Sequence, residues 1–358
     1  MSKQNNKSID FLTSVSTVIL IMAALLWSLG LVGRGVWRLT QEDNLNPTQS
    51  ETSTTEKPIE SEKSNAENFA QVQNVPTGLF RYGGSNAWAP IRLLLDSAIQ
   101  AERPEFQLRY VENDDSLSGS STGIQMLLED KLTFIQSSYP LQDSDYSQAE
   151  QRGFKIKQIP VAIDAIAVAV HPQLNIPGLT LDQLKSIYSG QIVNWQQLGG
   201  PDLEITAYSR PVKTGGTVEF FIEYVLRGQK LDSNVKFVST TTEGLRRLAD
   251  TPGGIYYASA PLIVRQCSIH PLPLSQVTGE FVPPYQEPFV SANLCPQQRN
   301  KLNMDAFQKR YYPLTRYLYV VVKENGGIEE QVGDTYANFL RSTQGQELIF
   351  RAGFVPLR

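Results

Sequence analysis

The sequence predicts an α/β fold with mainly parallel strands. Its 358 residues are enough for two domains of ordinary size, and 41% of them are hydrophobic. From Thr77 onward, short apolar strands alternate with amphipathic helices, which is typical of α/β layers. Three of the turns that lead from a strand into a helix are rich in glycine and hydroxyl side chains. Such turns lie at the carboxyl ends of strands, where open α/β sheets bind their ligands.

The N-terminal segment is expected to be an export signal or a membrane anchor. Residues 11–33 contain no charged side chain and are long enough to span a bilayer as a helix. We expect residues 1–40 to comprise a cytoplasmic tip and a transmembrane anchor. A cleaved signal peptide is the alternative, although its apolar core should be shorter and end at small residues. Basic residues flank the segment on both sides, so they do not fix its orientation.

Residues 41–76 are predicted to be a flexible linker. They are rich in Glu, Ser, Thr, Asn, Gln and Lys and contain few large apolar side chains. Such a segment buries too little surface to offset the entropy of ordering it. As a coil it would reach on the order of 30–35 Å.

The predicted strands and helices then follow in order. Pro90 suits the first turn of the first helix, and Thr180 is a good N-cap for the third. Strands are expected at residues 79–82, 106–111, 132–136, 159–170, 205–208, 254–257 and 317–322, and helices at 91–99, 124–128, 181–188, 218–226, 244–249 and 334–350.

Charge and composition exclude some classes of function. The net charge is −4 with no strongly basic segment, which argues against nucleic acid as a partner. His171 and His270 are the only histidines and lie in no spaced cluster, so no metal site is predicted. We expect no cofactor.

Two cysteines, Cys267 and Cys295, allow two interpretations. They could be buried thiols, or one disulfide in a protein exported from the cytoplasm, which the apolar N-terminal segment favours. In the chain-entropy model, closing this loop would stabilise the fold by roughly 3–4 kcal/mol.

The turn that begins at Arg210 is the clearest candidate for anion binding. Arg210 precedes Gly215, Gly216 and Thr217, which open the predicted helix 218–226. The first turn of a helix has unpaired N–H groups, glycine lets an anion approach them, and a guanidinium can bind it with two parallel hydrogen bonds. As the alternative, Arg210 would be a member of a surface ion pair.

Two other turns repeat this arrangement. They span residues 82–90 and 118–124, and both supply hydroxyl groups at the start of a helix. Three such turns could together surround a tetrahedral oxyanion, although each could also be an ordinary helix cap. None is followed by the Gly-Lys-Ser/Thr of a nucleotide-binding loop, which disfavours nucleotide hydrolysis.

The chain from residue 77 to 358 resembles the periplasmic phosphate-binding proteins of ABC transporters, the PstS family. The longest and most specific matching segment is residues 179–195, LTLDQLKSIYSGQIVNW. The other matching segments are residues 84–90, 119–124, 137–140, 159–170, 210–217, 253–258 and 312–319.

The resemblance implies a two-lobed periplasmic-binding-protein fold of type II with a hinge. Lobe 1 would comprise residues 77–163 plus 278–358, and lobe 2 residues 164–277. The protein would be a monomer outside the cytoplasm that captures inorganic phosphate or a similar oxyanion and presents it to a membrane permease. It would not be an enzyme.

The resemblance also implies a set of ligand-binding residues, with two departures from the family pattern. Ala87 stands where the family often has a hydroxyl, and Ser138 stands where some members have an aspartate. An aspartate there would favour a protonated anion. Asp164 could supply an acceptor or serve the hinge. The expected set is Ser85, Asn86, Trp88, Ser120, Ser121, Ser138, Arg210, Gly215, Gly216 and Thr217.

Two other functions remain open. The anchor and linker would suit a sensor or scaffold subunit that signals the presence of the anion. An enzyme would use Ser120 or Ser138 as a nucleophile, but neither histidine lies in a recognisable nucleophile–base motif.

Overall fold

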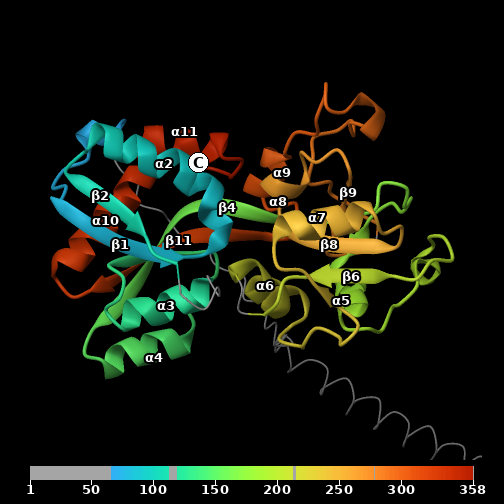
Figure 1. The fold of residues 1–358 in the computed structure, drawn as a ribbon, viewed down its shortest axis with the longest axis horizontal. Helices are drawn as coiled ribbons and strands as arrows, with labels where there is room; N and C mark the ends of the chain where they lie inside the picture. The colour runs from blue at the N-terminus through green and yellow to red at the C-terminus, as the bar shows by residue number, and fades with distance from the viewer. Residues whose placement is uncertain (1–65, 113–118, 213–214, 278, 358) are drawn as a thin grey trace, which may run out of the picture. The chain divides into compact units, whose positions relative to one another are not determined.

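The computed structural model describes residues 66–112, 119–212, 215–277 and 279–357 (Figure 1). The predicted anchor at residues 11–33 and most of the predicted linker lie outside these ranges. Within them, every helix is too short or too polar to cross a bilayer.

The folded body begins before Thr77, so the end of the predicted linker was placed too late. Phe69 starts the short helix η1 (Phe69–Gln71), and both Phe69 and Val72 are buried. Arg103 donates hydrogen bonds to the carbonyl oxygens of Ala70 at 2.8 Å and Val72 at 3.1 Å. A few well-spaced apolar side chains are enough to hold this segment, although its average composition is polar.

The described strands form a mixed sheet in the order β2-β1-β3-β11-β4-β8-β6-β7, with β9 also paired to β4. β11 is antiparallel to both of its neighbours, and β4 is antiparallel to β8 and β9, so the expectation of mainly parallel strands was only partly right. The strands are β1 (Gly78–Gly84), β2 (Phe106–Tyr110), β3 (Phe134–Ser137), β4 (Lys155–Val170), β6 (Thr206–Ser209), β7 (Lys236–Phe237), β8 (Gly254–Ser259), β9 (His270–Leu272) and β11 (Thr315–Glu324), with β5 (Leu179–Thr180) and β10 (Leu274–Ser275) in a separate pair.

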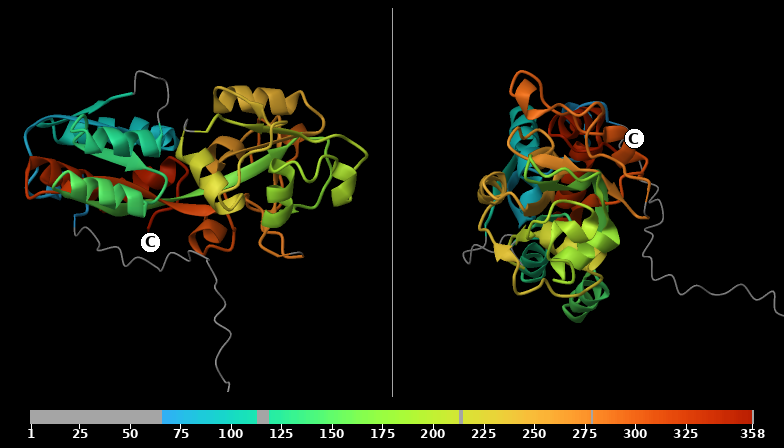
Figure 2. Two further views of the ribbon diagram at one scale, coloured as in Figure 1. Left: turned by 90° about the horizontal axis from the view of Figure 1, so that it is seen from below. Right: turned by 90° about the vertical axis from the view of Figure 1, so that its right-hand side faces the viewer.

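Helices cover both faces of the first part of the sheet (Figures 1 and 2). Alternate residues of β3 and β11 point to opposite faces, so Phe134 and Val320 join one core cluster while Ile135 and Val321 join another. The helices on the first face are α2 (Ala89–Glu102), α10 (Ile328–Arg341) and α11 (Thr343–Arg351), and those on the second are α3 (Ser120–Leu128) and α4 (Asp143–Gln151). We call this part the first lobe.

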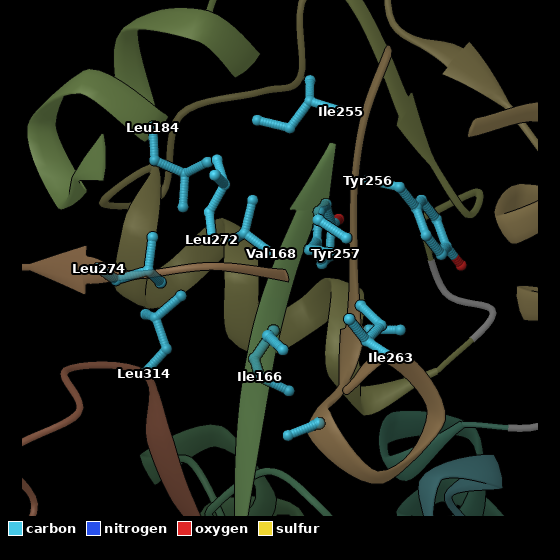
Figure 3. Packing of buried hydrophobic residues seen from close by; sticks show 14 of the residues in the cluster. Ile166, Val168, Leu184, Ile255, Tyr256, Tyr257, Ile263, Leu272, Leu274 and Leu314 are labelled. Atoms are coloured by element: carbon cyan, nitrogen blue, oxygen red, sulfur yellow. The ribbon is translucent and has the colours of Figure 1, made fainter. Parts of the chain in front are cut away.

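A separate core defines the second lobe. It gathers Ile166 and Val168 from β4, Tyr257 from β8 and Leu272 from β9 (Figure 3). Its helices are α5 (Leu181–Tyr188), α6 (Gly216–Phe220), the π-helix η4 (Phe221–Val225), α7 (Thr241–Ala249), α8 (Ala260–Ile263) and α9 (Met304–Gln308), with the 3₁₀ turns η3 (Trp195–Leu198) and η5 (Ala292–Leu294).

The chain returns to the first lobe later than residue 278. Phe307, Tyr312 and Leu314 pack in the core of the second lobe, so the return falls within β11. β4 and β11 are the long strands that connect the lobes, paired from Lys155 to Ala165 of β4.

One helix prediction agrees with the structure and another is corrected by it. α5 spans the predicted residues and begins with Thr180, whose hydroxyl accepts from the Gln183 N–H at 3.1 Å. The predicted helix 334–350 is instead two helices that meet at Ser342, because the Ser342 hydroxyl caps the second by accepting from the Gly345 N–H at 3.0 Å.

Cys267 and Cys295 form a disulfide, with their Cα atoms 5.8 Å apart. The bond links the segment after α8 to the end of η5 and holds this part of the second lobe together.

Candidate functional site

The first predicted turn, between β1 and the 3₁₀ turn η2 (Asn86–Trp88), is held tightly against β3. Gly84 has φ +114°, and a Cβ atom there would lie 2.2 Å from the Gln136 carbonyl oxygen, so only glycine fits. The Ser85 N–H donates to the same carbonyl at 2.7 Å. The Ser85 hydroxyl accepts from the Ala87 N–H at 3.2 Å, which fixes this buried side chain.

Ser120 and Ser138 join Ser85 to form a cluster of three buried serines, which we call the serine cluster. The hydroxyl oxygens of Ser85 and Ser138 are 2.6 Å apart, and those of Ser120 and Ser138 are 3.4 Å apart. The Ser138 N–H donates to the Ser120 hydroxyl at 3.0 Å. Each hydroxyl can donate and accept, so the cluster can exchange its internal hydrogen bonds for bonds to an anion.

Gly216 brings the second lobe into direct contact with the serine cluster. A Cβ atom on Gly216 would lie 2.3 Å from the Ser138 hydroxyl oxygen and 2.5 Å from that of Ser120. A Cβ atom on Gly215 would meet only the Arg210 Nη1, at 3.7 Å. Residues from three turns that are far apart in the sequence therefore meet at one place.

Arg210 follows β6 and has a buried nitrogen with no partner among the described residues. Its Nε is buried and makes no hydrogen bond to any residue that the structure describes. Leaving such a donor unpaired costs free energy, and a guanidinium cannot shed its proton to avoid this cost. An anion bound beside Gly215 and Gly216 would provide the missing acceptor.

Arg316 on β11 holds the second-lobe turn and was not predicted as a site residue. It donates to the Gly216 carbonyl oxygen and to the Thr217 hydroxyl, both at 2.8 Å. It also donates to Asp164 Oδ2 through Nε at 3.1 Å and Nη2 at 2.8 Å, and both side chains are almost fully buried.

Asp164 has a structural role between the lobes. Its second oxygen accepts from the Ser259 hydroxyl at 2.5 Å, so both oxygens are engaged. Burial raises the pKa of Asp164, while the Arg316 guanidinium opposes that shift. The sequence signal for this pair was a carboxylate within the apolar run of residues 159–170 and an arginine directly before the apolar run of residues 317–322, because buried charges need a partner.

Arg92 holds the first-lobe turn through a separate network. Its Nη1 donates to the Ser85 carbonyl and to Gln136 Oε1, both at 3.1 Å, and its guanidinium lies 3.8 Å from the centre of the Tyr110 ring. Gln136 in turn donates to the Tyr336 hydroxyl at 2.7 Å, and this hydroxyl donates to Asp96 at 3.1 Å.

Three other residues of the predicted set lie in or beside these turns, and no ligand is present to test their predicted role. The Trp88 N–H donates to the Ser85 carbonyl at 3.2 Å and its indole to the Ser137 carbonyl at 3.0 Å, so both donors are engaged within the first lobe. Asn86 is half-buried at the start of η2. Ser121 is exposed, and its hydroxyl donates to Glu219 at 2.6 Å. In the described ranges, no three His, Cys, Asp or Glu side chains are placed to hold a metal ion.

A two-lobed α/β fold whose lobes meet at a few polar turns is typical of proteins that close around a small ligand. The chain belongs to the family described as PBP superfamily domain, whose model matches residues 49–344.

The chain is similar in sequence to phosphate-binding proteins named PstS from several bacteria. The chain is 30% identical over 201 residues to the phosphate-binding protein PstS of Bacillus subtilis, covering 55% of this chain and 62% of the relative. The PstS of Pseudomonas aeruginosa PAO1 is 27% identical over 258 residues, covering 67% and 72%. The chain thus matches less than two thirds of the length of the Bacillus protein.

Solved structures support the same fold. A putative phosphate ABC transporter substrate-binding protein from Clostridium perfringens, with bound phosphate, has a TM-score of 0.61 at 22% identity and covers 78% of this chain and 100% of that one. An ABC-type phosphate transport receptor from Vibrio cholerae has a TM-score of 0.60 at 20% identity, with coverage of 77% and 99%.

Proposed function

We propose that this protein is an extracytoplasmic binding protein that captures inorganic phosphate between its lobes for uptake by an ABC transporter. The observation that carries the proposal is the contact of Gly216 with the serine cluster. The Arg210 guanidinium lies beside the neighbouring Gly215, and its Nε has no partner in the described part of the chain. The names of the relatives, which are phosphate-binding proteins, support phosphate as the ligand.

The geometry suits capture of an anion rather than chemistry on it. Serine hydroxyls and glycine N–H groups can donate hydrogen bonds, and Arg210 supplies a positive charge. Lobe closure would exclude water, which strengthens each of these bonds. The Thr217 hydroxyl already accepts from Arg316, which leaves its proton available to the anion.

Calorimetric titration of the full chain with phosphate, arsenate and sulfate tests the proposal. We expect phosphate to bind with micromolar or tighter affinity, and Arg210→Ala to remove most of this binding. Arg227→Ala is the matched control, because Arg227 is an exposed second-lobe arginine paired with Asp182. Binding of another oxyanion without any binding of phosphate would refute phosphate as the ligand.

We also propose that residues 11–33 anchor the protein in the membrane and that a linker joins this anchor to the folded body. The protein would act as a monomer. The apolar composition of residues 11–33 supports the anchor. We expect the chain to stay in the membrane fraction after alkaline extraction of cells. Its recovery in the extract would instead indicate a cleaved signal peptide.

A further inference from the structure

The Ser85 turn is held by a glutamine that acts on it in two ways. The Ser85 N–H donates to the backbone carbonyl of Gln136 at 2.7 Å. The side chain of Gln136, which is fully buried, accepts at Oε1 from Arg92 Nη1 at 3.1 Å, and the same Nη1 donates to the Ser85 carbonyl at 3.1 Å. The position of Arg92 beside this turn therefore depends on how the Gln136 side chain is oriented.

Gln136 can serve Arg92 in only one of its two amide orientations. The amide carries an acceptor oxygen on one side and a donor nitrogen on the other, whereas a guanidinium has donors only. The oxygen must therefore face Arg92, and the nitrogen then donates to the Tyr336 hydroxyl at 2.7 Å. Turning the amide over would place the Gln136 Nε2 donor against the Arg92 Nη1 donor.

The orientation of Gln136 depends in turn on a carboxylate, that of Asp96. The Tyr336 hydroxyl can accept from Gln136 because it donates its own proton to Asp96 Oδ1, at 3.1 Å. The Tyr82 hydroxyl donates to Asp96 Oδ2. An ionised carboxylate can only accept, so it fixes both hydroxyls as donors. Without this acceptor, Tyr336 could donate to Gln136 Oε1 and turn the amide away from its present orientation.

These groups join three separate elements of the first lobe. Asp96 lies on α2, four residues after Arg92, so both side chains project from the same face of the helix. Tyr336 lies on α10, 240 residues from Asp96, and its ring packs near that of Tyr82. Burial raises the pKa of Asp96, while the hydrogen bonds from Tyr82 and Tyr336 and the nearby charge of Arg92 oppose that shift.

We propose that Asp96, acting through Tyr336, is a positioning residue for oxyanion binding. The inference rests on the proposed function. The carboxylate fixes the direction of the hydrogen bond between Gln136 and Tyr336, and this direction holds Arg92 against the Ser85 carbonyl. The Ser85 hydroxyl is thereby kept in the serine cluster, where the anion would bind.

Phosphate titration of the full chain by calorimetry tests the inference with two matched hydroxyl deletions. Tyr336→Phe removes the link between Asp96 and Gln136, and we expect phosphate affinity to fall by about three- to tenfold. Tyr82→Phe is the matched control, because it also removes a buried hydroxyl that donates to Asp96 but leaves the bond between Gln136 and Tyr336 in place. Its affinity should stay within about twofold of the native value.

A double variant separates positioning from a general loss of stability. With Arg92→Met in place, no guanidinium is left to position, so adding Tyr336→Phe should change phosphate affinity by less than about twofold. A purely structural role of Tyr336 predicts the same loss in both backgrounds. That result, or a loss in Tyr82→Phe as large as that in Tyr336→Phe, would overturn the inference.

The remaining outcomes keep this inference apart from the proposed function. If the native protein binds no phosphate, the proposed function fails, and the same affinity ratios are measured with arsenate or sulfate, whichever it binds. A native protein that binds none of the three oxyanions overturns both. If Tyr336→Phe does not fold, Asp96→Asn decides in the same two backgrounds, because an asparagine amide can donate as well as accept.

Discussion

The two lobes hold their halves of the site in different ways. In the first lobe, Arg92 and Gln136 lie on α2 and β3 and support the Ser85 turn from within the same lobe. In the second lobe, the turn at Gly216 is held by Arg316, which lies on the connecting strand β11 and pairs with Asp164 on β4.

This difference assigns different mechanical roles to the lobes. The first-lobe turn is supported by neighbours that do not depend on the other lobe. The second-lobe turn is tied to the strands that connect the lobes, so its position depends on their arrangement. The second-lobe turn is therefore the half of the site whose geometry is coupled to the connecting strands, through Arg316.

Removing Arg316 should have the largest effect. Arg316→Met leaves the buried Asp164 carboxylate without its positively charged partner, and we expect a loss of about 3–5 kcal/mol in the free energy of unfolding, measured by urea denaturation. The double variant Asp164→Leu with Arg316→Met should recover most of this stability but still bind phosphate poorly, because Gly216 and Thr217 remain unsupported. Full recovery of binding would show that the second-lobe turn does not depend on β11.

Removing Arg92 tests the support of the first lobe. Arg92→Met removes the charged donor to the Ser85 carbonyl and leaves only the Trp88 N–H among the described donors, and we expect phosphate binding to weaken by about 1.5–3 kcal/mol in calorimetry. The exposed Arg109 of β2 offers a control for loss of charge, as Arg109→Met. Equal effects of the two variants would indicate that Arg92 acts only through its charge.

A methyl group at Gly216 tests how closely the lobes approach. Gly216→Ala would push against the hydroxyls of Ser120 and Ser138, and we expect it to weaken phosphate binding by about 1–3 kcal/mol. Gly215→Ala is the matched control, because its Cβ would make only an ordinary contact with Arg210. Comparable affinities for the two variants would mean that the contact at Gly216 is absent in the bound state.

The smallest expected effect concerns pH. Both histidines of the chain lie in the second lobe, and burial lowers the pKa of His270, whose ring lies 4.6 Å from that of Phe289. The folded state then binds fewer protons than the unfolded state, so stability should fall as the pH drops below about 6.5. Thermal melts of His270→Phe should lack this part of the pH dependence. Identical pH profiles for the two proteins would contradict the prediction.

The sequence located most elements, because apolar periodicity is a local property. α5 and β8 were predicted nearly to the residue, and the three turns at Ser85, Ser120 and Arg210 were recognised from their composition. The direction of β11 was not predicted, because strand direction depends on pairing with distant strands.

The sequence by itself determined where most of the strands and helices lie, and where the glycine- and hydroxyl-rich turns and the two cysteines lie. Only the tertiary structure decided that Arg316 pairs with Asp164 and that Glu219 reaches Ser121. The members of these pairs are 152 and 98 residues apart. A local pattern shows that a charged side chain will be buried and need a partner, but the partner is chosen by the packing of distant segments.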